Sequence, residues 1–306
     1  DVEQISRLAE RIVKSLRKDI RYRGQPCRVS VSAGIALKSD ENRQVKDLLS
    51  NADIALYRAK YEGRGRYEFY NPKDKTEIIR RKSIADELII ALEQNQITAF
   101  FQPQFNAKTL EVCGMEALAR WEHPTKGIIP PGDFLPIAQD LGLLGEIDHH
   151  ILTQAVTQLL LLDKAGFNIP RVSVNISSQR LKEPNFIDDL MELKLPTHRL
   201  SFELLETIFL DKTDAQMRAT LDLIRHLGIE LEIDDFGSGH ASILGLLDVR
   251  PSRFKIDREV IRDIDQSESA RALVKSIIGI GQSLDMQVVA EGVETAAHII
   301  EIQKTD

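Results

Sequence analysis

The feature that most limits the fold of this chain is an alternation of short apolar strands with helical patterns, which begins near Ile97. The strand-like segments are ITAFFQPQ (97–104), VCGMEALARW (112–121), VSVNISS (172–178), LSFELLE (200–206), IELEIDDF (229–236), RFKID (253–257) and QVVAEGV (287–293). Helical patterns such as 150–166 and 213–228 separate them, an order typical of parallel βα units. The number of strands favours a closed barrel over a doubly wound sheet, and no Gly-rich dinucleotide loop joins a strand to a helix.

A smaller α+β module precedes this region. A helical pattern (5–18), an alternating strand (27–37) and an amphipathic helix with a Gly-rich stop and an aromatic strand (45–71) follow one another. Pro72 and the charge run after it mark the best boundary. We therefore expect one domain at 1–71, a linker or helix at 72–86 and a second domain at 87–306.

Composition limits the partners and the location. The net charge of −7 argues against a nucleic-acid polymer as ligand. Cys27 and Cys113 lie far apart without metal-like spacing, so free core thiols are favoured over a disulfide, which indicates a cytoplasmic location. No apolar run of 18 residues occurs, and no membrane contact is expected within this segment. The chain begins inside a helical pattern and stops soon after a helix start, so we expect both ends to be truncated.

Polar side chains recur near the carboxyl end of each expected strand. Alternate side chains of a strand share a face, so Val172 and Val174 point one way and Ser173 and Asn175 the other. The same alternation separates Glu116, Glu203, Lys255, Asp257 and Glu291 from their apolar neighbours. Polar groups from several strand ends at one mouth are the layout of a barrel active site.

The pair Asp234-Asp235 points to metal ions. Converging carboxylates repel one another in a poorly hydrated site unless cations lie among them. Oxygen ligands without histidine suit Mg²⁺ or Mn²⁺, and adjacent aspartates could serve two ions. Each acid taken singly could instead be a solvated loop residue or a helix cap, and Asp235 could cap a turn. Glu232 shares the parity of Asp234 and is either a deeper polar residue or a sign of a wrong register.

The ordered motifs of the second domain resemble those of EAL domains, the cyclic-di-GMP phosphodiesterases. They are FQPQ, MEALARW, PPGDFLPIAQDLGLL, VNISSQRL, FELLET, IDDFGSG, KIDR and AEGVET. The resemblance implies a modified TIM (β/α)8 barrel whose first strand runs antiparallel, with the last strand and helix missing here. Gln139, Leu205 and His240 depart from the family's usual residues at positions that hold no metal.

The resemblance also implies roles for single residues. The implied metal ligands are Glu116, Asn175, Glu203, Asp234 and Asp235. Glu291 would be the general base and Lys255 the cation near the attacking water. Gln102, Arg120 and Asp257 would contact the substrate, and Glu206 and Glu294 would support the site, Glu294 by steadying the loop after Asp235.

The implied activity is hydrolysis of cyclic-di-GMP to linear pGpG with two Mg²⁺ or Mn²⁺ ions, in a homodimer formed through this domain. The alternatives are a silent cyclic-di-GMP receptor and a regulatory module that only mediates dimerisation. Retention of every implied metal ligand and of the implied base favours the enzyme.

The first module resembles the second half of a GGDEF (diguanylate cyclase) domain. VSVSAGIAL and LLSNADIALYRAKYEGRGRYEFYN carry this resemblance. The Gly-Gly-Asp-Glu-Phe segment that gives that family its name is not in the sequence, so we expect no cyclase activity from this half.

Three further features have weaker cases for function. His149 and His150 adjoin, so their side chains point apart and surface placement is favoured over a metal pair. Arg64 and Arg66 fit a solvated turn better than a phosphate site. Trp121 is either a stacking platform for a base or part of the core.

Overall fold

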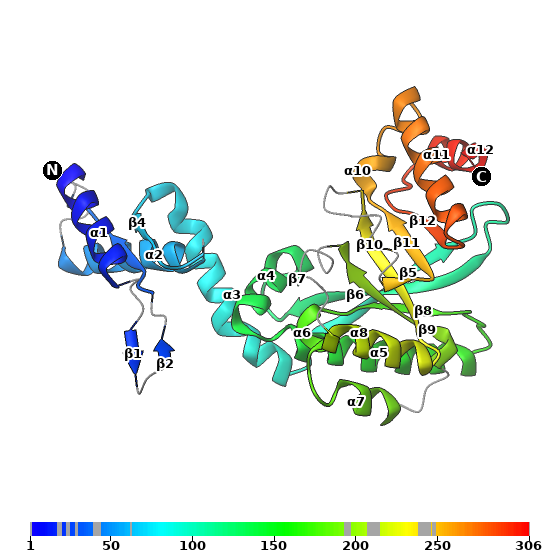
Figure 1. The fold of residues 1–306 in the computed structure, drawn as a ribbon, viewed down its shortest axis with the longest axis horizontal. Helices are drawn as coiled ribbons and strands as arrows, with labels where there is room; N and C mark the ends of the chain where they lie inside the picture. The colour runs from blue at the N-terminus through cyan, green and yellow to red at the C-terminus, as the bar shows by residue number, and fades with distance from the viewer. Residues whose placement is uncertain are drawn as a thin grey trace. The chain divides into compact units, whose positions relative to one another are not determined.

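The computed structural model describes residues 2–16, 20–22, 25–27, 30–38, 44–61, 63–192, 197–206, 215–237, 246 and 249–305. The chain divides into two units, Asp1–Ile90 and Ala91–Asp306, and each is described by itself (Figure 1).

The smaller unit has the α+β composition expected from the sequence. Its elements are α1 (Val2–Leu16), β1 (Ile20–Tyr22), β2 (Gln25–Cys27), β3 (Ala33–Ile35), α2 (Val45–Tyr61), β4 (Tyr67–Phe69), the 3₁₀ turn η1 (Pro72–Asp74) and most of α3 (Lys75–Glu93). Strands β1 and β2 pair antiparallel, and β3 and β4 pair parallel. Helix α2 lies so close to β3 that a Cβ on Gly34 would stand 2.0 Å from the Ala52 carbonyl oxygen. Helix α3 is continuous across the division between the two units.

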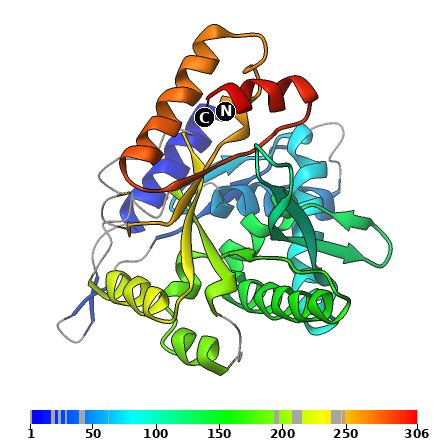
Figure 2. The same ribbon diagram turned by 90° about the vertical axis from the view of Figure 1, so that its right-hand side faces the viewer.

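The larger unit is built on one curved sheet. Its strands are β5 (Ile97–Phe105), β6 (Val112–His123), β7 (Gly127–Ile129), β8 (Val172–Asn175), β9 (Leu200–Leu205), β10 (Glu230–Phe236), β11 (Arg253–Ile256) and β12 (Gln287–Ala290). The order is β12-β11-β10-β9-β8-β6-β5, with β7 added to β6. This sequential order is that of a barrel and lacks the reversal of a doubly wound sheet. The sheet curls into half a barrel, and β5 and β12 are its edges among the described residues (Figure 2).

Strand direction agrees with both sources of prediction. Strands β6 and β8 to β12 run parallel along the sheet, as βα units require. Strand β5 pairs antiparallel with β6, which the family resemblance implied and the strand pattern alone did not.

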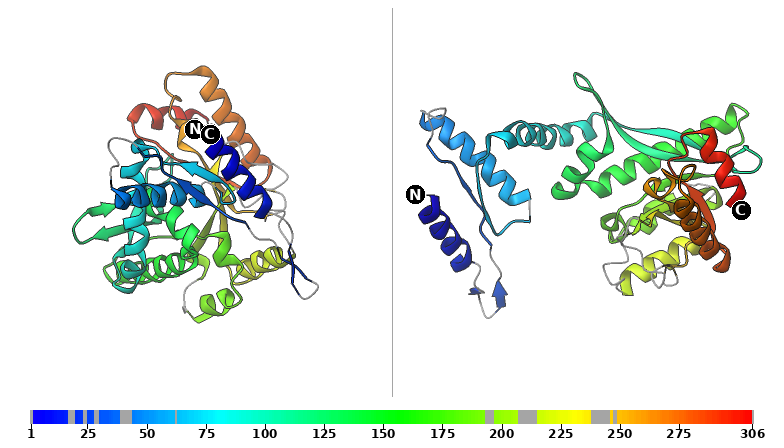
Figure 3. Two further views of the ribbon diagram at one scale, coloured as in Figure 1. Left: turned by 90° about the vertical axis from the view of Figure 1, so that its left-hand side faces the viewer. Right: turned by 90° about the horizontal axis from the view of Figure 1, so that it is seen from above.

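Helices cover the outer face of the half-barrel. They are α4 (Pro131–Leu141), α5 (Leu144–Lys164), α6 (Ser178–Leu181), α7 (Phe186–Glu192), α8 (Ala215–His226), α10 (Arg258–Ile261), α11 (Glu268–Ser283) and α12 (Ala296–Thr305), with the 3₁₀ turn η2 (Thr197–Arg199) before β9. The strands contribute fully buried Val174, Phe202 and Phe254 to the core. Helix α12 lies beside the turn between β5 and β6, where Gln303 Nε2 donates to the Ala107 carbonyl oxygen at 2.6 Å (Figure 3).

One cysteine expectation needs correction. Cys113 is a free thiol, as expected, but it is only half-buried. It lies at the start of β6, between Val112 and Gly114, where the pairing with β5 is irregular, and its charge interacts with that of Arg253. The side chain of Cys27 lies outside the described residues. Among the described residues, no helix is both long and apolar enough to cross a bilayer.

Candidate active site

The side chain of Lys255 is the centre of the polar cluster. It projects from β11 and is almost fully buried. Its Nζ lies 3.1 Å from Glu116 Oε2, 3.1 Å from Glu203 Oε2 and 3.1 Å from Asp234 Oδ1. Glu291 Oε1, which follows β12, lies at 2.6 Å. Four carboxylates from four places in the sequence therefore meet at one ammonium group.

Asn175 joins two of these carboxylates. It is the last residue of β8, and its Nδ2 donates to Glu203 Oε2 at 3.2 Å and more weakly to Glu116 Oε1 at 3.4 Å. Because the amide nitrogen makes both contacts, Oδ1 is the atom of this side chain suited to a cation.

A β-bulge brings the two adjacent aspartates to the same side of β10. Ile233 stands opposite Phe254 and Phe236 opposite Ile256, so Asp234 and Asp235 together oppose Lys255 alone. Asp235 has a φ of 58°, in the left-handed region that aspartate tolerates better than most residues. Its backbone N–H donates to Asp234 Oδ1 at 3.1 Å, which holds the bulge. The simple alternation of a strand would have put these carboxylates on opposite faces.

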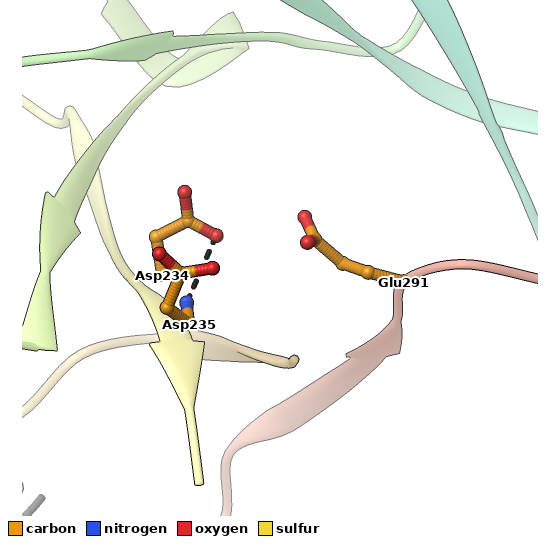
Figure 4. A group of neighbouring side chains, drawn as sticks. All are labelled: Asp234, Asp235 and Glu291. Atoms are coloured by element: carbon orange, nitrogen blue, oxygen red, sulfur yellow. Dashed lines mark hydrogen bonds between the residues drawn. The ribbon is translucent and has the colours of Figure 1, made fainter. Parts of the chain in front are cut away.

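Glu291 faces the bulge from across the site. Oxygen atoms of Asp234, Asp235 and Glu291 all lie within 4.8 Å of one another. Figure 4 shows the three carboxylates directed into a common space, with Asp234 and Asp235 on β10 and Glu291 just after β12. The backbone N–H of Glu291 donates to the Ile256 carbonyl oxygen at 3.1 Å and ties its position to β11.

Burial and like charges shift several pKa values. Burial raises the pKa of Glu203 well above its usual range, and the charge of Lys255 opposes that shift. Burial also raises the pKa of Glu291, again against Lys255. For Asp235, burial followed by the charges of Asp234 and Asp257 raises the pKa. Burial would lower the pKa of Lys255, but the surrounding carboxylates outweigh burial and raise it.

The donor set fits hard divalent cations. Every candidate ligand offers oxygen, which Mg²⁺ and Mn²⁺ prefer. Glu203 Oε1 is buried and has no hydrogen-bond partner, so a carboxylate oxygen is left that a cation would satisfy. The carboxylates around Lys255 outnumber its single positive charge, and excess negative charge in a buried site is costly unless cations neutralise it. The residues present therefore suit a metal centre.

Other predicted site residues lie on the elements around this cluster. Gln102 is exposed on β5, opposite Glu116 on β6. The guanidinium of Arg120 lies 5.9 Å from the Phe100 ring centre, and its Nη1 donates to the Ala119 carbonyl oxygen at 2.8 Å. Asp257 caps α10 by accepting from the Glu259 N–H at 2.6 Å. Its charge also contributes to the raised pKa of Asp235, so it lies near the bulge.

The two supporting glutamates differ in burial. Glu206 is buried just after β9, and its charge contributes to the raised pKa of Asp235. Glu294 is exposed, and its backbone N–H makes a long contact of 3.4 Å to His298 Nδ1. The loop that Glu294 was expected to steady, and the departure at His240, lie outside the described residues.

The weaker candidates lie away from the cluster. Trp121 is fully buried against Phe134 with its Nε1 donating to Gln96 Oε1 at 3.1 Å, so the core interpretation is correct. Arg64 is exposed in a turn, and Arg66 pairs with Glu68 at 2.5 Å. His149 is exposed and His150 is half-buried.

Two features of the predicted layout need refinement. Glu116 lies in the middle of β6 rather than near its end, because β6 continues past its pairing with β8 to pair with β5 and β7. Glu232 is a deeper polar residue and not a sign of a wrong register. Its Oε1 accepts from Arg253 Nη1 at 2.8 Å, and both side chains are buried. The two residues precede Asp234 and Lys255 by two positions on β10 and β11.

Asp148 was missed by the sequence reasoning. It is buried on α5, and its Oδ2 accepts from the Ser177 backbone N–H at 2.8 Å, two residues after Asn175. Burial raises its pKa to about 6, although the hydrogen bond from Ser177 opposes the shift. The available signal was an acidic residue on the apolar stripe of a helix, in line with Ile151 and Leu152.

Comparison with known proteins identifies two families along the chain. Residues 85–303 match the family described as EAL domain, and residues 1–66 match the family described as diguanylate cyclase, GGDEF domain. One similar protein is the bifunctional diguanylate cyclase/cyclic di-GMP phosphodiesterase MucR of Pseudomonas aeruginosa, with 34% identity over 296 residues. The alignment covers 95% of this chain and 43% of MucR, so the chain spans less than half of that relative.

Two solved structures share the fold. The complex of the PaMucR phosphodiesterase with c-di-GMP has a TM-score of 0.67 and 32% identity, over 73% of this chain and 92% of that one. The manganese and cyclic-di-GMP complex of Klebsiella pneumoniae BlrP1 has a TM-score of 0.58 and 28% identity, over 69% of this chain and 53% of that one. The half-barrel is therefore that of the modified TIM barrel expected from the motifs.

Proposed function

Because the chain belongs to the EAL domain family and carries a GGDEF-type segment before that domain, we propose that its larger unit hydrolyses cyclic-di-GMP. The product is linear pGpG, and the reaction requires two Mg²⁺ or Mn²⁺ ions. The observation that carries the proposal is the group of carboxylates around Lys255 and the β10 bulge. The MucR and BlrP1 structures contain the same dinucleotide, and that of BlrP1 also contains manganese.

Five oxygen-bearing residues are proposed to hold the cations: Glu116, Asn175, Glu203, Asp234 and Asp235. Bound cations would lower the pKa of a water molecule and neutralise charge on the phosphodiester. The bulge at Asp234-Asp235 is the device that presents two ligands from one strand end.

Glu291 is proposed to accept the proton of the attacking water. Burial raises its pKa, which makes the carboxylate a stronger base. As the water oxygen bonds to phosphorus, negative charge grows on the phosphate oxygens, one ring P–O bond breaks, and the released ring oxygen takes up a proton from solvent to become a hydroxyl. The buried ammonium of Lys255 stabilises that charge, while Gln102, Arg120 and Asp257 hold the substrate.

We also propose a cytoplasmic location and a homodimer formed through residues 87–306, as the family resemblance implies. Neither is needed for the test of activity.

The test is chromatography of cyclic-di-GMP after incubation with the 306-residue chain and Mg²⁺ or Mn²⁺. Formation of pGpG with metal, and its loss with EDTA, is the expected result. Binding of the dinucleotide without cleavage under both metals would contradict the proposal and favour the receptor alternative.

A further inference from the structure

The turn that follows Asn175 is held at three points. Asn175 ends β8, and α6 begins at Ser178. The Ile176 N–H donates to the Glu203 carbonyl oxygen at 3.0 Å, which ties the turn to β9. Ser177 caps α6, since its Oγ accepts from the Arg180 N–H at 3.2 Å. The backbone N–H of Ser177 donates to Asp148 Oδ2 at 2.8 Å.

Asp148 is an unusual residue for its place in the fold. Its neighbours along the buried stripe of α5 are Ile147, Ile151 and Leu152, all almost fully buried. A carboxylate in such surroundings is costly unless it is paired or accepts hydrogen bonds. The nearby Arg180 is already paired, through Nη1 with Glu183 and through Nη2 with Asp189 at 2.5 Å. Ser177, through its backbone N–H and its side chain, is thus the main direct partner of the Asp148 carboxylate.

The position of that bond relative to the site suggests what it does. Ser177 is two residues from Asn175, whose side chain spans Glu116 and Glu203. A turn free to shift by a fraction of an ångström would move the Asn175 amide out of reach of one or both carboxylates, because hydrogen bonds weaken steeply with distance and angle. Residues that do not contact a metal but orient its ligands change the metal affinity by ~10–100-fold when they are replaced.

We propose that Asp148 is a positioning residue of the metal centre. Through the Ser177 N–H it fixes the turn between β8 and α6, and so fixes Asn175 between the two glutamates. This inference rests on the proposed function, because it takes Asn175 as a metal ligand. Helix α5, on the outer face of the half-barrel, would thus help to position a metal ligand on the inner face.

Isothermal titration calorimetry of the 306-residue chain with Mn²⁺ alone tests the inference. Asp148→Leu removes the acceptor and leaves the Ser177 cap of α6 in place. Ser177→Pro removes the backbone donor at a residue whose φ of −74° suits proline, but it also removes the hydroxyl that caps α6, so Asp148→Leu is the cleaner of the two. Both are expected to weaken Mn²⁺ binding by ~10–100-fold. Asp148→Asn keeps an acceptor oxygen and should stay within about threefold of the wild type. Asp163→Asn, which breaks an exposed pair with Arg199 on the same helix, is the matched control and should bind as the wild type does.

Several outcomes would overturn the inference. Wild-type Mn²⁺ affinity in folded Asp148→Leu or Ser177→Pro would mean that the bond does not position the ligand. Loss of affinity in Asp148→Asn equal to that in Asp148→Leu would show that the charge matters and the acceptor does not. Failure of both disruptive variants to fold would assign the bond to packing of α5 alone.

The proposed function fails separately from this inference. A wild-type chain that binds Mn²⁺ but cleaves no cyclic-di-GMP contradicts the proposed function and leaves the Mn²⁺ comparison among variants readable.

Discussion

Replacement of Asp148 by asparagine is expected to stabilise the larger unit, and the gain should depend on pH. Burial raises the pKa of Asp148 from the usual 3.8 to about 6. An acid with a raised pKa binds its proton more tightly in the folded protein. Protonation of Asp148 therefore contributes fully to the stability of the folded state below pH 4, and this contribution is lost as the pH rises through 6. Asparagine, which does not ionise, avoids that loss and can still accept from the Ser177 N–H.

The magnitude follows from the two pKa values. Each pKa unit corresponds to ~1.4 kcal/mol, so the penalty on the wild type reaches ~3 kcal/mol at pH 8. At pH 4.5 the folded protein has Asp148 protonated while the unfolded chain is mostly ionised, and the penalty is only ~1 kcal/mol. The gain in free energy of unfolding for Asp148→Asn should therefore roughly triple between these pH values.

Urea unfolding followed by tryptophan fluorescence measures this gain. Trp121 is the only tryptophan in the sequence, and it is fully buried in β6, so its emission reports on the larger unit. Asp163→Asn is the control on the same helix. The Arg199 guanidinium lowers the pKa of Asp163, so this substitution should reduce stability at pH 8. A gain for Asp148→Asn that is equal at both pH values, or absent at pH 8, would refute the reasoning.

Three further perturbations test the rest of the site. Glu291→Gln should lower the rate of cyclic-di-GMP cleavage by ~10²–10⁴-fold and leave dinucleotide affinity nearly unchanged in calorimetry, and a parallel loss of affinity would mean that Glu291 binds metal or substrate instead. Arg253→Met leaves Glu232 buried without its partner and should cost ~3–5 kcal/mol in urea unfolding, most of which the added Glu232→Leu should restore. Asp235→Asn tolerates the left-handed backbone but loses the charge, so Mn²⁺ affinity should fall while the urea midpoint of the metal-free chain should not fall, and an unchanged affinity would exclude Asp235 as a ligand.

Strand parity was the part of the site that could be read most directly from the sequence. The alternation placed Phe202 and Phe254 toward the helices and Glu203 and Lys255 toward the inner face, and the structure has them there. The period of two is a local property of the backbone, so neighbouring residues suffice to predict it. The antiparallel direction of β5 came from the family resemblance and not from that period.

The geometry at Asp234-Asp235 could not be read in this way. A bulge depends on how β10 pairs with β11, about twenty residues further along the chain, and the local pattern of either strand does not specify it. The same limit applies to Asp148, whose partner Ser177 is 29 residues away. The sequence reasoning turned to His149 and His150 instead, because adjacent histidines are conspicuous and a single acid in a helix is not.

The sequence by itself determined the order of strands and helices, the face on which each side chain lies and, through its motifs, the family. These properties depend on residues close together or on ordered motifs. The tertiary structure alone decided which polar residues meet. Lys255 pairs with Glu116, 139 residues earlier, because curling of the sheet brings β6 and β11 to face one another across its inner side. Only this curvature of the sheet brings scattered acids into one site with excess negative charge, which divalent cations can neutralise.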